Sequence, residues 1–133
     1  MNRPVSQMIL VVDDDPDFLD QVKRAFVPES AGGVLFAGNA KQALILMDKL
    51  GSAVTLAMID LNLPGVDGFA LITKMREGFP DLPIIAISGV VRDTALESAR
   101  LVGATEVLPK PITTEWAAAV ERVRRLARSR NLS

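Results

Sequence analysis

The sequence contains neither cysteine nor histidine. Without cysteine, no disulfide and no thiolate metal site can form. Without histidine, imidazole catalysis, His-ligated zinc and a phosphohistidine made on this chain are excluded. The formal net charge is −1, which gives no electrostatic case for binding nucleic acid or a membrane. No apolar run reaches the length of a membrane span, and the opening MNRPVSQ has no signal-peptide core, so we expect a cytoplasmic location.

Hydrophobic residues make up 49% of the 133 residues, enough for one domain with a sizeable core. We expect a single domain over residues 1–133, with its core at about 7–128 and a tail or the start of a linker at 129–133. Five short aliphatic runs have the character of strands buried on both faces, as in a parallel sheet. They are MILVV (8–12), VLFA (34–37), LAMI (56–59), PIIAIS (83–88) and EVLP (106–109).

An amphipathic stretch follows each of these runs and predicts a helix. The first helix has Asp15 as its N-cap and Pro16 as its first residue, and the second lies between Asn39 and Gly51. The other three are predicted at about 68–77, 93–102 and 113–128. Five β-then-α units favour a doubly wound α/β sheet with right-handed crossovers.

Ligands of such folds bind beyond the carboxyl ends of the strands. Polar residues stand at four of these five ends: Asp13 and Asp14, Asp60, Ser88, and Lys110. Carboxylates that converge on one edge need a cation, and oxygen ligands of this kind suit Mg²⁺. Lys110 and Ser88 would complete a pocket for a tetrahedral oxyanion. Asp60, alone on its strand end, is placed to attack phosphorus and form an aspartyl phosphate.

VVDDD, MIDLNLPGVDG, AISG and LPKP resemble, in order and spacing, the motifs of two-component response-regulator receiver domains. The resemblance covers about residues 7–128 and implies a flavodoxin-like (β/α)5 fold with strand order 2-1-3-4-5. It implies that Asp60 is the phosphoacceptor. Mg²⁺ (or Mn²⁺) would be held by Asp14 directly, by Asp13, by Asp60 and by the backbone carbonyl of Asn62.

The same resemblance implies that Ser88 is the hydroxyl switch, that Lys110 pairs with the phosphoryl group and that Pro111 follows a cis peptide bond. The donor would be a bacterial sensor histidine kinase or a histidine phosphotransfer protein. Phosphorylation would change the face made by the fourth helix, fifth strand and fifth helix, through which an effector or a second copy could bind. Position 107 departs from the family pattern, because Val107 stands where Tyr or Phe is usual.

Two alternatives remain open at the level of sequence. A haloacid-dehalogenase-type phosphatase would use Asp13 and Asp15 with Ser88 and Lys110, but it needs a later acidic pair, and Asp60 has no role in it. A receiver-like docking module that is never phosphorylated is the second. Asp15 and Asp17 are interpreted as a cap and a first-turn carboxylate, and Trp116 as core. The arginines near the carboxyl end are interpreted as a solvated helix face, not a nucleic-acid site.

Overall fold

A computed structural model describes residues 8–26, 33–63, 68–89, 93–110 and 112–131. The predicted alternation of strands and helices is confirmed in these residues. The elements, in chain order, are β1 (Met8–Val12), α1 (Pro16–Phe26), β2 (Val34–Ala37), α2 (Ala40–Leu50), a short 3₁₀-helix η2 (Gly51–Ala53), β3 (Val54–Asp60), α3 (Gly68–Gly78), β4 (Ile84–Ser88), α4 (Asp93–Leu101), β5 (Glu106–Pro109) and α5 (Thr114–Asn131). None of the described helices is both long and apolar enough to cross a membrane.

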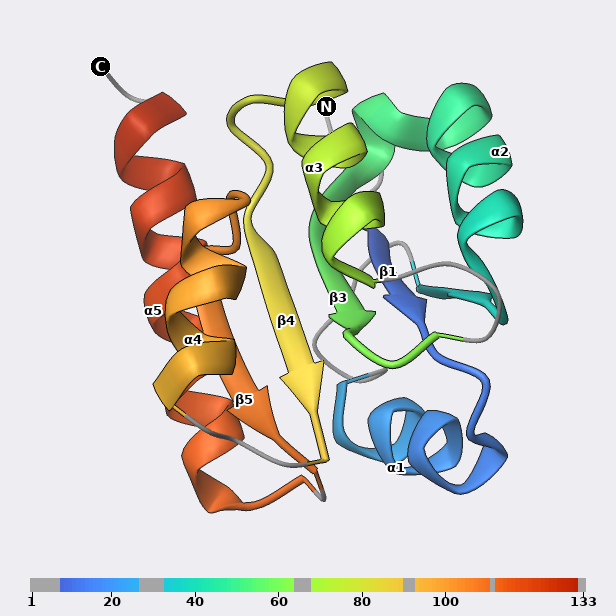
Figure 1. The fold of residues 1–133 in the computed structure, drawn as a ribbon, viewed down its shortest axis with the longest axis vertical. Coiled ribbons are helices and arrows are strands. Elements are labelled where there is room, and N and C mark those ends of the chain that lie inside the picture. Colours follow the sequence, from blue (N-terminus) through green and yellow to red (C-terminus); the bar gives the residue numbers. More distant parts are fainter. Residues whose placement is uncertain (1–7, 27–32, 64–67, 90–92, 111, 132–133) are drawn as a thin grey trace, which may run out of the picture.

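The strands form one parallel sheet in the order β2-β1-β3-β4-β5, which confirms the predicted fold class and strand order. In Figure 1 the labelled strand arrows point toward the same lower edge, so their carboxyl ends gather there. The strands lie inside the molecule: Ile9, Leu10, Val11 and Val12 of β1 are all fully buried. Their unbroken aliphatic character follows from this burial on both faces.

Helices cover both faces of the sheet and divide the core into two layers. One layer packs α2, α3 and the end of α4 against one side, with Met47, Ile72 and Ala99 among its buried residues. The other packs α1 and α5 against the opposite side, around Phe18 and Trp116. The predicted core position of Trp116 is confirmed, since its side chain is 0% exposed.

Helix ends follow the capping residues of the sequence. Asp15 Oδ1 accepts hydrogen bonds from the backbone N–H of Asp17 (3.0 Å) and, at 3.5 Å, from that of Phe18. Asn39 Oδ1 accepts from Gln42 N–H at 2.9 Å. Both predicted N-caps are therefore confirmed.

The end of α2 differs from the usual glycine cap. Gly51 keeps a right-handed conformation (φ −56°) and continues into η2. A Cβ at this position would overlap the ring of Phe79. Gly51 is thus required for a close approach between segments, not for a left-handed turn.

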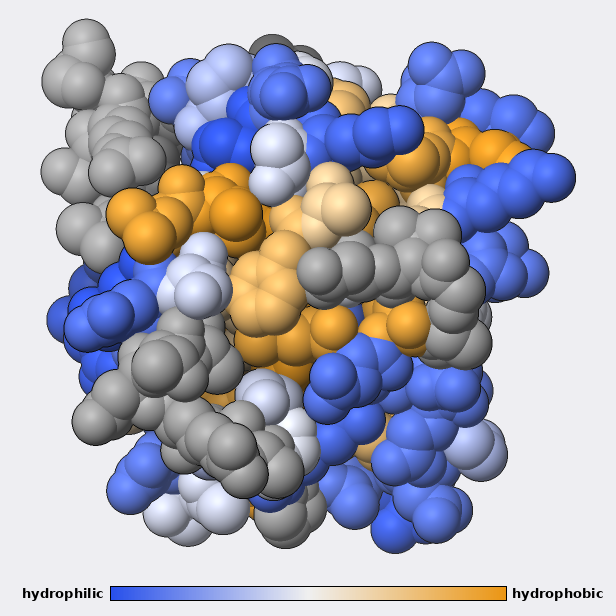
Figure 2. All heavy atoms as spheres, viewed as in Figure 1, coloured by the Kyte–Doolittle hydropathy of each residue, from blue (hydrophilic) through white to orange (hydrophobic). Residues whose placement is uncertain are grey.

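Hydrophobic side chains also reach the surface on the face that carries α2, α3 and α4, where Figure 2 shows them interspersed with hydrophilic residues. Leu101 at the end of α4 is 86% exposed, and Ile45 on α2 is 46% exposed. A groove between α2 and α3 is lined by Leu44, Ile45, Leu71 and the stems of Lys41 and Lys74, among others. None of the polar residues at the strand ends is among those that line this groove.

Candidate functional site

Three aspartates meet at the carboxyl edge of the sheet. Asp13 follows β1 and is 0% exposed, Asp60 ends β3 and is 4% exposed, and Asp14 is exposed to solvent. One carboxylate oxygen from each lies within 4.8 Å of the others. The central position of β1 and β3 in the sheet explains why residues 13 and 60 come together.

Backbone hydrogen bonds fix the two buried carboxylates. Asp13 Oδ1 accepts from the N–H of Asp15 at 2.9 Å, and Asp60 Oδ1 accepts from the N–H of Asn62, also at 2.9 Å. Each bond spans two residues, so each carboxylate closes a turn just beyond its own strand. The Oδ2 atom of each carboxylate is left to face Lys110.

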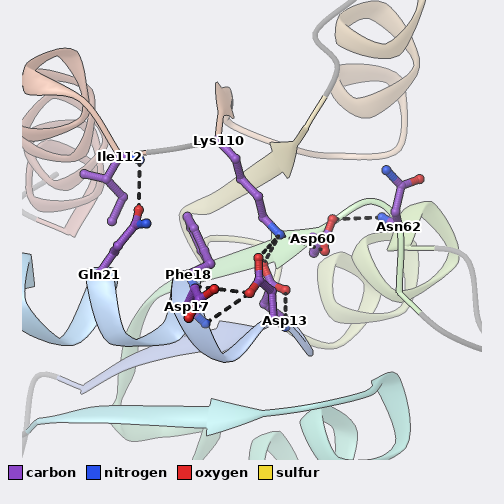
Figure 3. Close-up of polar contacts among 9 residues, drawn as sticks. Asp13, Asp17, Phe18, Gln21, Asp60, Asn62, Lys110 and Ile112 are labelled. Atoms are coloured by element: carbon purple, nitrogen blue, oxygen red, sulfur yellow. Dashed lines mark hydrogen bonds and ion pairs between the residues drawn. The ribbon is translucent and has the colours of Figure 1, made fainter.

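Lys110, directly after β5, extends its ammonium group over these carboxylates (Figure 3). Its Nζ lies 2.7 Å from Asp13 Oδ2, 3.4 Å from Asp60 Oδ2 and 4.0 Å from Asp15 Oδ2. The backbone N–H of Lys110 donates to the carbonyl of Ser88 at 3.1 Å, which ties this residue to the end of β4. One cation thus faces a cluster of four aspartates, counting Asp14.

Burial is the main cause that raises the pKa of Asp13 above its ordinary value, and the charge of Asp60 adds to it. The ammonium of Lys110 and the Asp15 N–H partly offset the rise. For Lys110, burial alone would lower the pKa, but the contact with Asp13 and the charges of Asp13 and Asp60 outweigh it, so the pKa is raised. The lysine therefore stays charged, whereas Asp13 carries its charge at a cost.

The donor set fits a hard divalent cation. Asp13 Oδ2 is buried and accepts no hydrogen bond from any described residue, although Lys110 Nζ lies at ion-pair distance. Three carboxylates with one oxygen each inside 4.8 Å match the oxygen ligands that Mg²⁺ takes from proteins. The acidic cluster could hold a metal ion.

The other expected site residues lie around the cluster. Ser88 ends β4 and is 5% exposed, and Asn62 is exposed beyond β3. Val107 is 8% exposed, inside β5, and it packs with the core layer of α2, α3 and α4. Pro111 and its expected cis bond lie outside the described residues, as do Pro64 and Asp67 of the LNLPGVDG segment. The cis peptide bond before Pro111 therefore stays a prediction.

Sequence reasoning missed two contributors to the site. Phe18, in the first predicted helix, places its ring under the Lys110 ammonium, with Nζ 4.8 Å from the ring centroid. Gly68, interpreted as the start of a helix, lies so close to β3 that a Cβ would overlap the carbonyl oxygen of Asp60. An aromatic residue in the first turn after the acidic run was the available signal for Phe18. Nothing in the sequence pattern signalled the approach at Gly68.

The structure also describes the acidic residues on which the phosphatase alternative depends. Asp15, its second carboxylate, caps α1 through Oδ1. The later acidic residues, Glu115 and Glu121, are both exposed on α5, and Glu121 pairs with Arg125 at 3.4 Å. Arg122 pairs with Glu106 at 3.2 Å, so these two arginines lie on a solvated face, as expected. The side chains of Arg124, Arg128 and Arg130 lie outside the described part of the chain.

Comparisons with known proteins found relatives that are similar over most of this chain. An uncharacterized 14.6 kDa protein in the sodA1 3′ region of Leptolyngbya boryana is 38% identical over 115 residues, which is 83% of this chain and 84% of that protein. The transcriptional regulatory protein AruR of Pseudomonas aeruginosa is 36% identical over 111 residues, 78% of this chain but 43% of AruR. The chain thus spans less than half the length of that relative.

Solved structures show the same fold. The receiver domain of NtrX from Brucella abortus matches with a TM-score of 0.78 and 31% identity, covering 88% of this chain and 98% of that domain. The family model described as response regulator receiver domain matches residues 9–120. With this match over most of its length and a parallel sheet that ends in an acidic cluster, the chain belongs to the response regulator receiver domains of two-component systems.

Proposed function

We propose that the chain is a phosphoacceptor switch in which Asp60 receives a phosphoryl group. The donor is a sensor histidine kinase or a histidine phosphotransfer protein, since this chain has no histidine of its own. One observation carries the proposal: Asp60 lies at a strand end with two further carboxylates within 4.8 Å and the Lys110 ammonium 3.4 Å from its Oδ2. A nucleophile, a metal-binding set and a fixed cation therefore stand together.

In the proposed reaction a carboxylate oxygen of Asp60 attacks phosphorus and forms a new O–P bond. The bond from phosphorus to its leaving group breaks, and its electron pair goes to the imidazole nitrogen of the donor, or to the acetate oxygen when acetyl phosphate is the donor. Lys110 is already charged and close to Asp60, so it can stabilise negative charge on the transferring group without moving far. Ser88, at the end of the neighbouring strand, supplies a hydroxyl to the phosphoryl oxygens.

We propose that Asp13, Asp14, Asp60 and the backbone carbonyl of Asn62 hold Mg²⁺ (or Mn²⁺). When bound, the metal neutralises charge on the phosphoryl group and on the carboxylates. The fit rests on the buried oxygen of Asp13 and on the closeness of the three carboxylates. Asp14 is the exposed member, so it gives a metal access from solvent.

We further propose that phosphorylation shifts the population of conformations at the face of α4, β5 and α5, which binds an effector or a second copy. Leu101 at the end of α4 is 86% exposed on this part of the molecule. Arg122 and Glu106 pair across α5 and β5 at 3.2 Å, so the face also carries charge. Val107 supplies no aromatic ring for this response.

Incubation with acetyl phosphate and Mg²⁺, followed by intact mass spectrometry, tests the proposal. We expect one phosphoryl adduct on the wild-type protein, and none on Asp60→Ala or in a sample with chelated metal. Asp81→Asn is the matched control, because Asp81 is an exposed aspartate in the segment between α3 and β4.

The remaining outcomes separate the alternatives. Steady release of phosphate without a lasting adduct would favour the phosphatase. Neither adduct nor phosphate release would indicate a docking module. An adduct that persists in Asp60→Ala would contradict the assignment of the phosphoacceptor.

A further inference from the structure

The Lys110 ammonium has an aromatic neighbour as well as its carboxylates. Phe18, in the first turn of α1, is 2% exposed, and its ring centroid lies 4.8 Å from Lys110 Nζ. A cation within about 6 Å of a ring face is attracted by the ring's quadrupole. Phe18 therefore gives Lys110 an aromatic contact in addition to its carboxylates (Figure 3).

Phe18 in turn contacts the only tryptophan of the chain. The rings of Phe18 and Trp116 have their centroids 5.7 Å apart and are tilted by 58°, within the favourable range for aromatic pairs. Trp116 is 0% exposed, and its Nε1–H donates to the carbonyl of Pro109 at 2.8 Å. Pro109 immediately precedes Lys110. Trp116 thus touches both the ring beneath the ammonium and the backbone that carries it.

A second contact joins the same two helical regions. The backbone N–H of Ile112, just before α5, donates to Gln21 Oε1 of α1 at 3.4 Å. Phe18 and Trp116 belong to the core layer of α1 and α5, whereas Val107 belongs to the opposite layer. A path from the site through these two rings therefore needs no aromatic residue at position 107.

We propose that Phe18 is a positioning residue for Lys110 and that Phe18 and Trp116 couple the acidic site to the start of α5. The ammonium lies 2.7 Å from Asp13 and 3.4 Å from Asp60. A cation that binds these carboxylates must therefore displace the ammonium from its present position. Displacement changes what the Phe18 ring contacts and, through that ring, the surroundings of Trp116. Only this response to a bound cation rests on the proposed function.

Tryptophan emission of the full chain, without metal, tests the coupling itself. The chain has one tryptophan and no tyrosine, so emission reports on Trp116 alone. We compare wild type, Lys110→Met, Phe18→Leu and the double variant. Removal of the ammonium should change the emission intensity when Phe18 is present, and this change should be lost when Phe18 is leucine. An equal change in both backgrounds would overturn the proposal.

Phe79→Leu is the matched control, because Phe79 packs in the opposite core layer. In that background the effect of Lys110→Met should be the same as in wild type. Phe18→Met serves as a second variant without an aromatic ring, and urea unfolding shows that each protein compared is folded. Loss of the effect in Phe79→Leu as well would mean that any core change abolishes it, which contradicts a specific role of Phe18.

A titration with Mg²⁺ extends the test to the loaded site. In wild type, Trp116 emission should change with the same midpoint as Mg²⁺ binding measured by calorimetry. In Phe18→Leu the calorimetric binding should remain, while the emission change is lost. An emission change that persists in Phe18→Leu would overturn the coupling. Absence of calorimetric binding in wild type would instead contradict the proposed metal site, and the metal-free comparison would still decide the role of Phe18.

Discussion

Asp13 is the residue at which burial and charge conflict most directly. Its carboxylate is 0% exposed, and burial raises its pKa because the charged form loses hydration. Asp60 and Asp14 bring further negative charge within 4.8 Å. The site therefore holds a charge that is unfavourable for folding, which is common where a residue is kept for binding a cation.

Replacing Asp13 by asparagine should stabilise the metal-free protein. Asparagine keeps an oxygen for the Asp15 N–H but removes the buried charge, and Lys110 retains Asp60 as a partner. We expect the free energy of unfolding in urea at neutral pH to rise by on the order of 1 kcal/mol, the usual size of a single substitution. Mg²⁺ should stabilise wild type but not the variant. A less stable variant would contradict this account of Asp13.

The raised pKa of Asp13 also predicts how the free energy of unfolding changes with pH. The folded-state pKa of Asp13 is raised from 3.8, so the folded protein binds this proton more tightly than the unfolded chain. Stability is therefore lost as pH rises from 3.8 through the folded-state pKa. The advantage of Asp13→Asn over wild type should vanish below pH 3.8 and be complete above the folded-state pKa of Asp13. Urea unfolding of both proteins over this range checks it, and a constant difference would argue against it.

The raised pKa of Lys110 gives a pH dependence of the same sign, but in the alkaline range. Its folded-state pKa is raised above 10.5, so it contributes stability that is complete below 10.5 and lost as pH rises through the folded-state value. Wild type should lose more stability than Lys110→Met between about pH 9 and about pH 11.5. Since the chain has no tyrosine, cysteine or histidine, other lysines are the main background, and they are common to both proteins. Equal losses would show that Lys110 is not stabilised by its carboxylates.

At the scale of elements, the start of α3 is packed against the end of β3. Gly68 N–H donates to the carbonyl of Leu61 at 3.3 Å, and a Cβ at residue 68 would lie 2.6 Å from Leu61 Cα. A contact this short would force the backbone to shift. Because Asp60 precedes Leu61, the position of α3 and that of the Asp60 backbone depend on each other.

Gly68→Ala should therefore destabilise the protein by about 1–3 kcal/mol, the range for overpacked sites, and should also weaken Mg²⁺ binding. Gly78→Ala is the matched control in the same helix, because a Cβ there meets nothing within 4 Å. Urea unfolding and calorimetry measure the two effects. If both variants behaved alike, the close approach would have no energetic consequence.

The elements themselves could be predicted well because local signals agree. The caps Asp15 and Asn39 fix two helix starts, and Gly103 (φ 116°) lies just beyond the end of α4. The predicted boundaries of the elements were less accurate: β3 extends over Val54–Asp60, beyond the predicted 56–59. Its extra residues are set by pairing with neighbouring strands, such as Val54 with Met8, which no local pattern reveals.

At the scale of the whole molecule, the site exists only when the sheet is complete. Asp13, Asp60, Ser88 and Lys110 come from segments after or at the ends of four different strands. Their meeting could be predicted because parallel strands present their carboxyl ends at one edge. Their contacts could not: the approach of Lys110 to Phe18 joins residues 92 positions apart (110 − 18) and depends on how α1 packs.

A ligand that binds only the folded chain should stabilise the whole molecule. At a Mg²⁺ concentration 100 times its dissociation constant, the gain in unfolding free energy is about 2.7 kcal/mol. We expect this gain in wild type and its loss in Asp14→Asn, since Asp14 is the exposed member of the cluster. Asp48→Asn, on the exposed side of α2, is the control and should respond like wild type. Equal responses of the three proteins would place the metal elsewhere.

The measurement that tests the central claim most directly is to locate the phosphorylated residue. After reaction with acetyl phosphate and Mg²⁺, borohydride reduces an aspartyl phosphate to homoserine, and tandem mass spectrometry of the digested protein finds its position. Our account predicts homoserine at residue 60, with Asp13, Asp14 and Asp15 unmodified. Homoserine at residue 13, the nucleophile of the phosphatase alternative, would contradict it.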